Sequence, residues 1–389
     1  MSFDVPPTVN DVPTPCFLVD LDKVKRNVAR MRDACSSLGV EHRPHVRCHR
    51  TLEGGELQTG GTRRKIVVST LDEATFFADG GFEDILFAIP ITQSKIRGCQ
   101  KLANRLNEFH VLFDSQHGVQ SLKHATLKDG KKWSALLKVD TGHARTGVLC
   151  DSEEAIHLAK EAHEAENVDF KGVYTHEGHS YFIKGVQEQM QFGHEIVDKL
   201  LTLASRLRAT GVDCRILAAG STPTCSHPAE NAGLLTELHP GAYFFYDQEL
   251  LLLGCCTSAD IACRVATRVV SHKKSHNEFL VDAGYMALGH DGIAQQPPGG
   301  FCKFQEYDHL RMVCLDQEMG KVTTTNSKLD FDEFPIGKIL FIYPYHAGST
   351  ASQHPLYFVH SGERVTGTWR PTRGWHPRSN HVPEKHLCA

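Results

Sequence analysis

The stretch KIVVSTLDEATFFADGGFEDILFAIP, residues 65–90, contains two short apolar segments separated by sequence of helix length. The two segments, KIVVST (65–70) and DILFAIP (84–90), are candidate buried strands because they are short, apolar and rich in β-branched residues. A strand, a helix and a second strand in succession are typical of a parallel sheet.

The same alternation extends in both directions from this stretch. Before it, residues 21–38 carry apolar side chains at helical spacing, with Asp20 as a plausible N-cap and Gly39 as the stop. Amphipathic stretches such as 153–165 and 186–209 separate later strands. The candidate strands are 40–47, 65–70, 84–90, 108–114, 134–141, 170–176, 215–221 and 237–243. Eight apolar strands with helix-length connections predict an α/β fold of the (β/α)8 barrel type, with a doubly wound open sheet as the alternative.

The pattern changes beyond about Cys256. Segments such as IACRVATRVV and IGKILFIYPY are short, rich in β-branched and aromatic residues, and broken by polar turns without helical periodicity. We therefore predict two domains, a barrel over residues 15–256 and a mostly antiparallel β domain over residues 257–382.

The composition favours a globular protein that binds small molecules. Hydrophobic residues make up 41% of the chain, charged residues 23%, and the net charge is -4. No basic block marks a nucleic-acid surface, and no apolar run approaches the roughly 20 residues needed to span a membrane. The N-terminus lacks the pattern of a signal peptide, and 13 cysteines without a CxxC pair fit reduced thiols. We expect a cytoplasmic protein.

Polar residues stand at the predicted carboxyl ends of the strands, where the active site of a barrel lies. They are Arg47 after the first strand, Asp140, Thr141, His143 and Arg145 after the fifth, Tyr174 and His176 at the sixth, Ser221 and Thr222 at the seventh, and His239 and Gly241 at the eighth. The last two loops, AAGSTPTCSHP and HPGAYFF, offer hydroxyls and free backbone N–H groups. Barrels often bind phosphate there, so a phosphate-bearing cofactor is implied.

The first predicted strand, within HRPHVRCHRT (42–51), carries an unusual density of cations and imidazoles. With a period of two, Arg43, His45, Arg47 and His49 share one face. Buried guanidinium groups are costly unless they are paired or bound to an anion. We interpret this face as the wall of a site, with an exposed edge strand as the alternative.

Several motifs now carry a resemblance to a known family. They are TPCFLVDLDKVKRNVARM (14–31), RPHVRCHRT (43–51), VVSTLDEA (67–74), VDTGHARTGV (139–148), YTHEGHSY (174–181), GSTPTCSHP (220–228) and ELHPGAYFFYD (237–247). In this order they resemble the eukaryotic D-serine dehydratases, alanine-racemase-like enzymes of fold type III that use pyridoxal 5'-phosphate (PLP). D-threonine aldolases are relatives. The resemblance implies a PLP- and zinc-dependent homodimeric lyase that converts D-serine to pyruvate and ammonia.

The resemblance also implies roles for individual residues. Tyr174 and Tyr181 match tyrosines that contact the cofactor, and His346 matches a zinc ligand. The matches to the family's phosphate cradle are Ser221, Thr222, Gly241 and Ala242. From the sequence itself we place His45 near the site, and we expect Arg145 to position a carboxylate or the cofactor ring. His49 is placed near the site on the same grounds as His45, whereas the loop residues His176 and His179 are weaker candidates.

Two departures from the family pattern concern the chemistry directly. In the family, the sequence of the first strand is RPHVKTHKT, and the first lysine of this motif forms the Schiff base with PLP. This chain has Arg47 there and Arg50 at the second lysine. A guanidinium is a poor nucleophile and cannot abstract the α-proton. The family's zinc pair is His-x-Cys, and this chain reads His346, Ala347, Gly348, so a thiolate ligand is lost.

The sequence therefore predicts a protein that recognises PLP or a similar phosphate ligand without a covalent link, and whose dehydratase activity is weak or absent. One alternative is an active D-amino-acid lyase or D-threonine aldolase-like enzyme that uses other groups, such as another lysine. A second alternative is a noncatalytic PLP-binding or regulatory protein. The expected ligand is D-serine or a related D-hydroxyamino acid. Cys48, Ser349 and His354 are conceivable replacement metal ligands, although lone residues of these types are more often structural.

Overall fold

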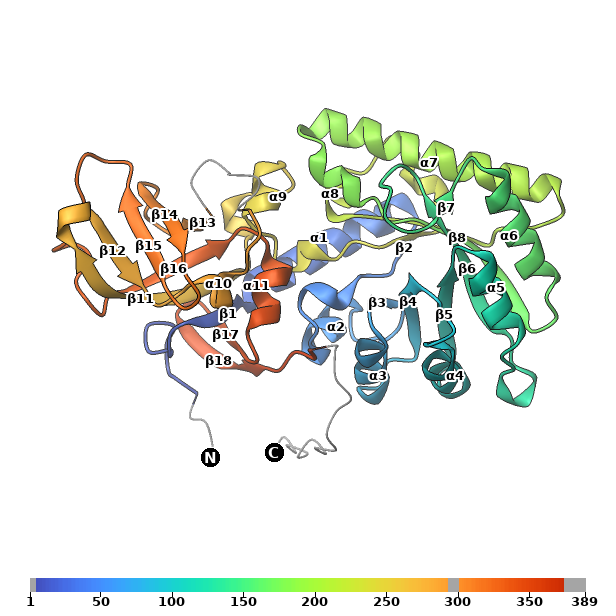
Figure 1. The fold of residues 1–389 in the computed structure, drawn as a ribbon, viewed down its shortest axis with the longest axis horizontal. Coiled ribbons are helices and arrows are strands. Elements are labelled where there is room, and N and C mark those ends of the chain that lie inside the picture. Colours follow the sequence, from blue (N-terminus) through green and yellow to red (C-terminus); the bar gives the residue numbers. More distant parts are fainter. Residues whose placement is uncertain (1–4, 293–300, 374–389) are drawn as a thin grey trace.

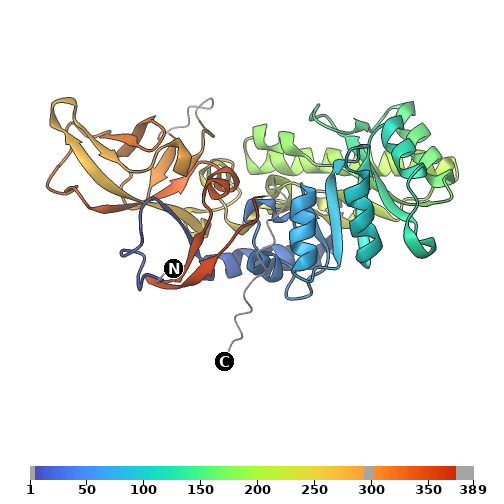
Figure 2. The ribbon, with the colours of Figure 1, turned by 60° about the horizontal axis from the view of Figure 1, so that its bottom comes forward.

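The computed structural model describes residues 5–292 and 301–373. In this part of the chain the strands form two sheets. Figures 1 and 2 show, in two orientations, a barrel wrapped by helices in one half of the molecule and a second sheet in the other half. None of the helices in the described ranges has the length and apolar character needed to cross a membrane.

The first sheet is a parallel barrel. Its strands are β2 (Glu41–His42), β3 (Ile66–Val68), β4 (Asp84–Pro90), β5 (Glu108–Phe113), β6 (Trp133–Asp140), β8 (Val168–Tyr174), β9 (Ile216–Ala219) and β10 (Glu237–Leu238). They lie in the order β2-β10-β9-β8-β6-β5-β4-β3, and a bridge between His45 and Val67 closes the ring. The short β7 (Val148–Leu149) pairs with β6. The predicted (β/α)8 barrel is confirmed.

Helices connect the strands and cover the outside of the barrel (Figure 1). They are α2 (Leu52–Gln58), α3 (Leu71–Asp79), α4 (Ile96–Arg105), α5 (Gln116–Lys123), α6 (Glu153–Glu164), α7 (Val186–Ala209) and α8 (Thr222–Ser226). Their start points follow local chemistry: Thr70 and Glu73 form a capping box at α3, and Ser152 caps α6. Every residue of β6 is buried, as expected for a strand covered on both faces.

The second sheet is antiparallel in every described pair except β1 with β17. Its strands are β1 (Cys16–Asp20), β11 (Cys263–Lys273), β12 (Glu278–Val281), β13 (Cys302–Phe304), β14 (Leu310–Leu315), β15 (Gly320–Thr324), β16 (Ile339–Pro344), β17 (Tyr357–Ser361) and β18 (Arg364–Trp369). Three short helices, α9 (Gln248–Leu252), α10 (Tyr285–Leu288) and α11 (Ala347–Gln353), belong to this later part of the chain. The predicted mostly antiparallel β domain is confirmed.

Strand β1 links the two halves. It pairs with β11 and β17 of the second sheet and leads directly into α1 (Leu21–Leu38), which Asp20 caps as predicted. Residues 16–20, which the sequence assigns to the barrel domain, therefore take part in the other sheet. The domain limits 15–256 and 257–382 stay a prediction, and residues 374–382 lie outside the described ranges.

The first predicted strand is wrong in its extent. Only Glu41 and His42 form a strand, and Val46–Cys48 form a single turn of 3-10 helix. The chain turns after His45, which is still extended and forms the bridge to Val67. A period of two does not persist through such a turn, so the four predicted side chains do not share one face.

Candidate active site

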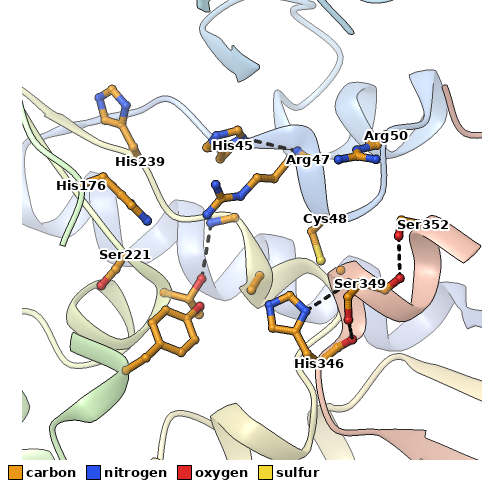
Figure 3. Close-up of a pocket in the computed structure, with 15 residues that line it drawn as sticks. His45, Arg47, Cys48, Arg50, His176, Ser221, His239, His346, Ser349 and Ser352 are labelled. Carbon is orange, nitrogen blue, oxygen red and sulfur yellow. Dashed lines mark hydrogen bonds between the residues drawn. The ribbon is translucent and has the colours of Figure 1, made fainter. Parts of the chain in front are cut away.

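A cavity of about 230 Å³ lies where the loops after the barrel strands meet α11. Sequence-predicted residues that line it are His45, Arg47, His176, Tyr181, Ser221, Thr222, Gly241, Ala242 and His346. Figure 3 shows Arg47 extending from its turn toward the side where His176 and Ser221 lie, with Cys48 and His346 on another side. Segments that are far apart in the sequence thus meet in one cavity, as the barrel prediction requires.

Tyr174 and Arg145, for which we predicted roles beside the cofactor, do not line this cavity. Tyr174 is only 1% exposed, and its ring packs under the Lys138 ammonium, with Nζ 4.4 Å from the ring centroid. Arg145 is exposed on the loop after β6. Burial and the neighbouring charge of Arg47 lower the pKa of Arg145, so the two guanidinium groups are electrostatic neighbours. Their predicted roles in cofactor contact and positioning stay predictions.

The other cations and imidazoles of the first motif point elsewhere. Arg43 is 2% exposed and binds Glu237 and Asp84, with Nε to Oε2 at 3.0 Å and Nη1 to Oδ1 at 2.5 Å. His49 is buried between Thr51 and Gln58. Of the four side chains predicted on one face, His45 and Arg47 face the cavity. The buried guanidinium of Arg43 is compensated by carboxylates, which is the structural role that its burial demands.

Arg47 differs from the neighbouring arginines because it has no ion pair in the described part of the chain. Arg50 lies 2.8 Å from Glu73, measured from Nε to Oε1, and this carboxylate also caps α3. The backbone N–H of Arg47 instead donates to His45 Nδ1 at 3.4 Å, while His45 Nε2 lies 3.3 Å from Ser69 Oγ. The Arg47 guanidinium is therefore free to bind an anion in the cavity.

Buried basic groups surround Arg47. Burial, with the charge of Arg47 next in importance, holds the pKa of His45 and of His176 well below the usual range. His176 Nδ1 donates to the Gly220 carbonyl at 3.1 Å. Burial, Arg145 and Arg47 also lower the pKa of Lys138 to about 7. At neutral pH these imidazoles are uncharged and a large fraction of Lys138 is a free amine.

The residues matched to the phosphate cradle, Ser221, Thr222, Gly241 and Ala242, do come together, and we call them the cradle. Thr222 Oγ1 accepts hydrogen bonds from the backbone N–H groups of Gly241 and Tyr243 at 3.4 and 3.3 Å. A Cβ atom at position 241 would stand 2.8 Å from the His45 carbonyl oxygen, so the backbone approach requires glycine. The hydroxyl groups and the Arg47 guanidinium can donate hydrogen bonds to a phosphate group, and the small residues leave room for it.

A buried carboxyl group lies directly behind the cradle. Glu177 is 3% exposed, and its Oε2 accepts a hydrogen bond from Thr224 Oγ1 at 2.6 Å. Thr224 Oγ1 is in turn 2.9 Å from Ser221 Oγ. Burial raises the pKa of Glu177 to about 7 although these hydrogen bonds oppose the shift. The charge behind the cradle therefore changes near neutral pH.

The residues around His346 do not form a zinc site. His346 Nδ1 accepts a hydrogen bond from the Ser349 N–H at 3.1 Å, which starts α11. A Cβ atom at position 348 would lie 3.1 Å from His346 Cε1 and 3.8 Å from Cys48 Cα, so a side chain there would stand beside His346. In residues 5–292 and 301–373, no group of three or more His, Cys, Asp or Glu side chains is placed to hold a metal ion. The donor set thus does not fit zinc.

The candidate replacement ligands have other partners or surroundings. Ser349 Oγ donates to Asp291, and His354 Nε2 bonds the Ala287 carbonyl at 2.9 Å. Cys48 lines the cavity beside Gly348, but burial and Asp247 raise the pKa of its thiol. Cysteine binds a metal as the thiolate, so a thiol that resists ionisation is a poor ligand.

Sequence reasoning did not single out Lys138 or Glu177. A lysine within the apolar segment SALLKVD was a visible signal for Lys138, because a buried ammonium needs a partner or a shifted pKa. Glu177 stands between a glycine and a histidine in a loop, and nothing in its local sequence indicates burial. His239, predicted only as a strand end, is 3% exposed, lines the cavity and has no hydrogen-bond partner for Nδ1 in the described part of the chain.

Comparison with known proteins gives the relationship of the chain. The family profile of the alanine racemase N-terminal domain matches residues 19–249, and that of a serine dehydratase domain matches residues 262–360. The D-serine dehydratase of Dictyostelium discoideum is 33% identical over 391 residues, which cover 94% of this chain and 98% of the relative. The chain belongs to the D-serine dehydratase family. The D-serine dehydratase of Schizosaccharomyces pombe is 30% identical, over 95% of this chain and 93% of that protein.

Solved structures of related enzymes superpose on this member of the D-serine dehydratase family. D-threo-3-hydroxyaspartate dehydratase from Delftia sp. HT23 superposes on this chain with a TM-score of 0.89 at 28% identity. The superposition covers 95% of this chain and 100% of that chain. An alanine racemase from Bacillus anthracis gives a TM-score of 0.68 at 15% identity, covering 92% and 98% of the two chains. The second likeness shows the fold alone. The family is that of the fold type III PLP proteins. A D-threo-3-hydroxyaspartate dehydratase, 29% identical, and a D-threonine aldolase, 27% identical over 61% of this chain, are relatives.

Proposed function

We propose that this protein binds PLP, or a similar phosphate-bearing ligand, by noncovalent contacts in the cavity and has weak or no D-serine dehydratase activity. The observation that carries the proposal is Arg47, a guanidinium without an ion pair in the described ranges, which lines the same cavity as the cradle. The cradle supports recognition of the ligand, and Arg47 argues against a covalent link to it.

The phosphate end of such a ligand has suitable partners. The hydroxyls of Ser221 and Thr222 and the close backbone at Gly241 can surround phosphate oxygens, and Arg47 can pair with the negative charge. Ser221 Oγ lies 2.8 Å from Ser180 Oγ and 2.9 Å from Thr224 Oγ1, and these two contacts fix its position. These contacts need no chemistry at the aldehyde.

The other end lacks the groups that a dehydratase uses. When bound, PLP supplies an electron sink for the α-carbon of an amino acid. In the described chain, the residues that line the cavity include no lysine, and a guanidinium neither attacks an aldehyde well nor removes a proton near neutral pH. His45 and His176 are uncharged and can accept protons, but their hydrogen bonds direct them to Ser69 and Gly220.

Zinc is not part of the proposal. His346 lacks a second ligand at Gly348, and a catalytic zinc takes about three protein ligands. Among related structures, D-threo-3-hydroxyaspartate dehydratase has been solved as a cysteine-to-alanine variant in a metal-free form. Elimination of a β-hydroxyl without a Lewis acid is slow, which is a second reason to expect weak turnover.

A second candidate is an active D-amino-acid lyase or D-threonine aldolase-like enzyme in which another lysine supplies the amine. Lys138 favours this candidate, because its pKa of about 7 leaves a free amine and its neighbours Arg47 and His176 line the cavity. A noncatalytic PLP-binding or regulatory protein is the third candidate, and it predicts ligand binding without any turnover.

A paired experiment tests the proposal. The purified protein is titrated with PLP while its melting temperature is recorded, and pyruvate release from D-serine is then measured with PLP and zinc present. We expect a PLP-dependent rise in melting temperature and pyruvate release near the background rate. Rapid pyruvate release would overturn the proposed weak activity, and the absence of any PLP effect on melting would overturn the proposed binding.

The predicted cytoplasmic location and homodimer rest on the sequence and the resemblance, and they stay predictions. D-serine or a related D-hydroxyamino acid is the small molecule expected beside PLP, since the names of the relatives specify such substrates for those proteins.

A further inference from the structure

A groove of about 520 Å³ lies at the amino ends of β2 and β3, at the end of the barrel that faces away from the candidate active site. We call it the basal groove, and the lining residues that concern us are Arg32, Glu41, His42, Gln58, Arg64 and Lys65. It shares no lining residue with the candidate active site. The proposed function makes no use of it.

The basal groove carries an excess of positive charge. Arg32 and Arg64 line it, and neither has an ion pair or a side-chain hydrogen bond in the described part of the chain. Lys65 Nζ lies 2.8 Å from Glu41 Oε2, and among the described residues this is the only carboxylate that lines the groove. Three cations and one carboxylate leave two positive charges without a partner, which favours an anionic ligand.

The turn that carries Arg64 also holds Arg32 in place. Arg63 and Lys65, on either side of Arg64, have positive φ angles of 52° and 59°, a backbone conformation that costs a residue with a Cβ atom about 1–2 kcal/mol. The Arg32 guanidinium lies against Gly60, because a Cβ atom at position 60 would stand 2.3 Å from its Nη1. Both arginines are therefore brought to the same groove by one turn.

A chain of buried hydrogen bonds determines which nitrogen of His42 carries the proton. The chain begins at His49, whose Nδ1 accepts the Thr51 backbone N–H at 3.1 Å. Burial lowers the pKa of His49 to about 4, so its neutral ring donates from Nε2 to Gln58 Oε1 at 2.9 Å. Gln58 Nε2 then donates to the Tyr243 hydroxyl at 3.1 Å, and that hydroxyl lies 3.0 Å from His42 Nε2.

His42 consequently presents an N–H donor to the basal groove. Tyr243 is fully buried, and His42 Nε2 is the acceptor available to its hydroxyl proton in the described ranges. The proton of the neutral His42 ring is therefore on Nδ1. This nitrogen has no hydrogen-bond partner among the described residues, and it is not one of their fully buried unpaired atoms. Nδ1 is thus accessible from the groove that His42 lines.

These groups match one kind of ligand. Guanidinium groups bind phosphate oxygens in a bidentate manner, and a fixed N–H donor can bond a further oxygen. Two unpaired positive charges match a phosphate group, which carries nearly two negative charges at neutral pH, better than a carboxylate with one. We infer that the basal groove binds a phosphate group, as inorganic phosphate or as a small phosphomonoester, independently of the candidate active site.

The test is a phosphate titration of the wild-type protein containing nitrogen-15-labelled histidine, followed by magnetic resonance. Before phosphate is added, His42 should show a protonated Nδ1 and an unprotonated Nε2 at pH 7. Phosphate should then shift the His42 Nδ1 signal to saturation, and acetate at the same ionic strength should need about 10-fold higher concentrations. A protonated Nε2, no shift with phosphate, or an equal response to acetate would overturn the inference.

Variants locate the binding. Arg32→Gln and Arg64→Gln should each raise the phosphate concentration at half-saturation about 10-fold through loss of a charge-assisted hydrogen bond. Arg97→Gln is the matched control, because Arg97 is an exposed arginine of α4 that lines neither site. Arg47→Gln should leave the His42 response unchanged. A response that is lost in Arg47→Gln but kept in both groove variants would assign the phosphate to the candidate active site and contradict us.

Glycerol phosphate distinguishes the two sources of the phosphate group. Tighter binding than that of inorganic phosphate, lost in the same two groove variants, would identify the ligand as a phosphomonoester. Equal or weaker binding would identify it as inorganic phosphate.

Discussion

At the scale of single residues, the charge balance around the cradle depends on Glu177. Its carboxyl group has a pKa of about 7, raised by burial, so it is mostly neutral at pH 6 and mostly ionised at pH 8. Thr224 Oγ1 connects Glu177 to Ser221 of the cradle, so the ionised carboxylate would repel a phosphate group bound there. The free energy of the proposed phosphate binding should therefore depend on pH through Glu177.

Glu177→Gln should strengthen the binding of a phosphate ligand at pH 8 and change it little at pH 6. We expect a gain of about 1 kcal/mol, roughly fivefold, because two like charges that are separated by two hydroxyl groups repel each other. Titration of PLP into both proteins at the two pH values measures the effect. Equal affinity of the two proteins at pH 8 would show that Glu177 does not act on the cradle.

Arg47 and Gly348 give a second prediction at this scale. The double substitution Arg47→Lys with Gly348→Cys should allow a covalent link to PLP and should raise zinc affinity, because an amine faces the cavity and a thiol stands beside His346. The measurements are the absorbance of the protein with PLP and its zinc content after dialysis. Arg63→Lys, an exposed arginine, is the matched control. A colourless double variant would contradict our alignment of the first motif.

At the scale of elements, the first motif shows what a periodic pattern can and cannot predict. The pattern correctly indicates that this segment reaches the site, and His45 and Arg47 do line the cavity. It fails for Arg43, whose partners Asp84 and Glu237 come from β4 and β10. Such partners are brought together by barrel closure, and nothing within the local segment specifies them.

Arg43→Met should destabilise the protein by about 3–5 kcal/mol, because it leaves buried carboxylates without their counter-ion. Arg63→Met is the control, since the pair of Arg63 with Glu56 is exposed and should contribute no more than about 1 kcal/mol. Urea unfolding of the three proteins gives the comparison. A loss for Arg43→Met as small as for the control would mean that water or another cation compensates these carboxylates.

The same buried pair predicts how stability depends on acid. Burial raises the pKa of Asp84, but the hydrogen bond from His110 and the charge of Arg43 outweigh it and lower this pKa to about 2. The unfolded chain has a pKa near 3.9, so the stabilisation is present above about pH 4 and is lost as the pH falls toward 2. Unfolding midpoints measured from pH 5 to pH 2 should fall more steeply in the wild type than in Asp84→Asn. Parallel curves for the two proteins would contradict this assignment.

At the scale of the whole molecule, the sequence predicts the architecture and most of the cavity. The alternation of strand and helix patterns predicts the barrel, and the order of the motifs brings Ser221, Thr222, Gly241 and His346 to one place. Tyr174 and Arg145 lie just outside the cavity, because a match in sequence does not specify which side of a strand end or loop faces inward. The pKa of Lys138 is lowered first by burial and then by the charges of Arg145 and Arg47. The apolar segment SALLKVD indicates the burial, but no local pattern places Arg47 beside this lysine.

The measurement that tests the central claim most directly is borohydride reduction of the wild-type protein saturated with PLP, followed by denaturation, dialysis and peptide mapping. If Arg47 excludes the covalent link, PLP should be removed completely and no peptide should carry a pyridoxyl group. A pyridoxyl group found on a lysine of the folded protein, at Lys138 or elsewhere, would contradict noncovalent binding and favour the active-lyase alternative.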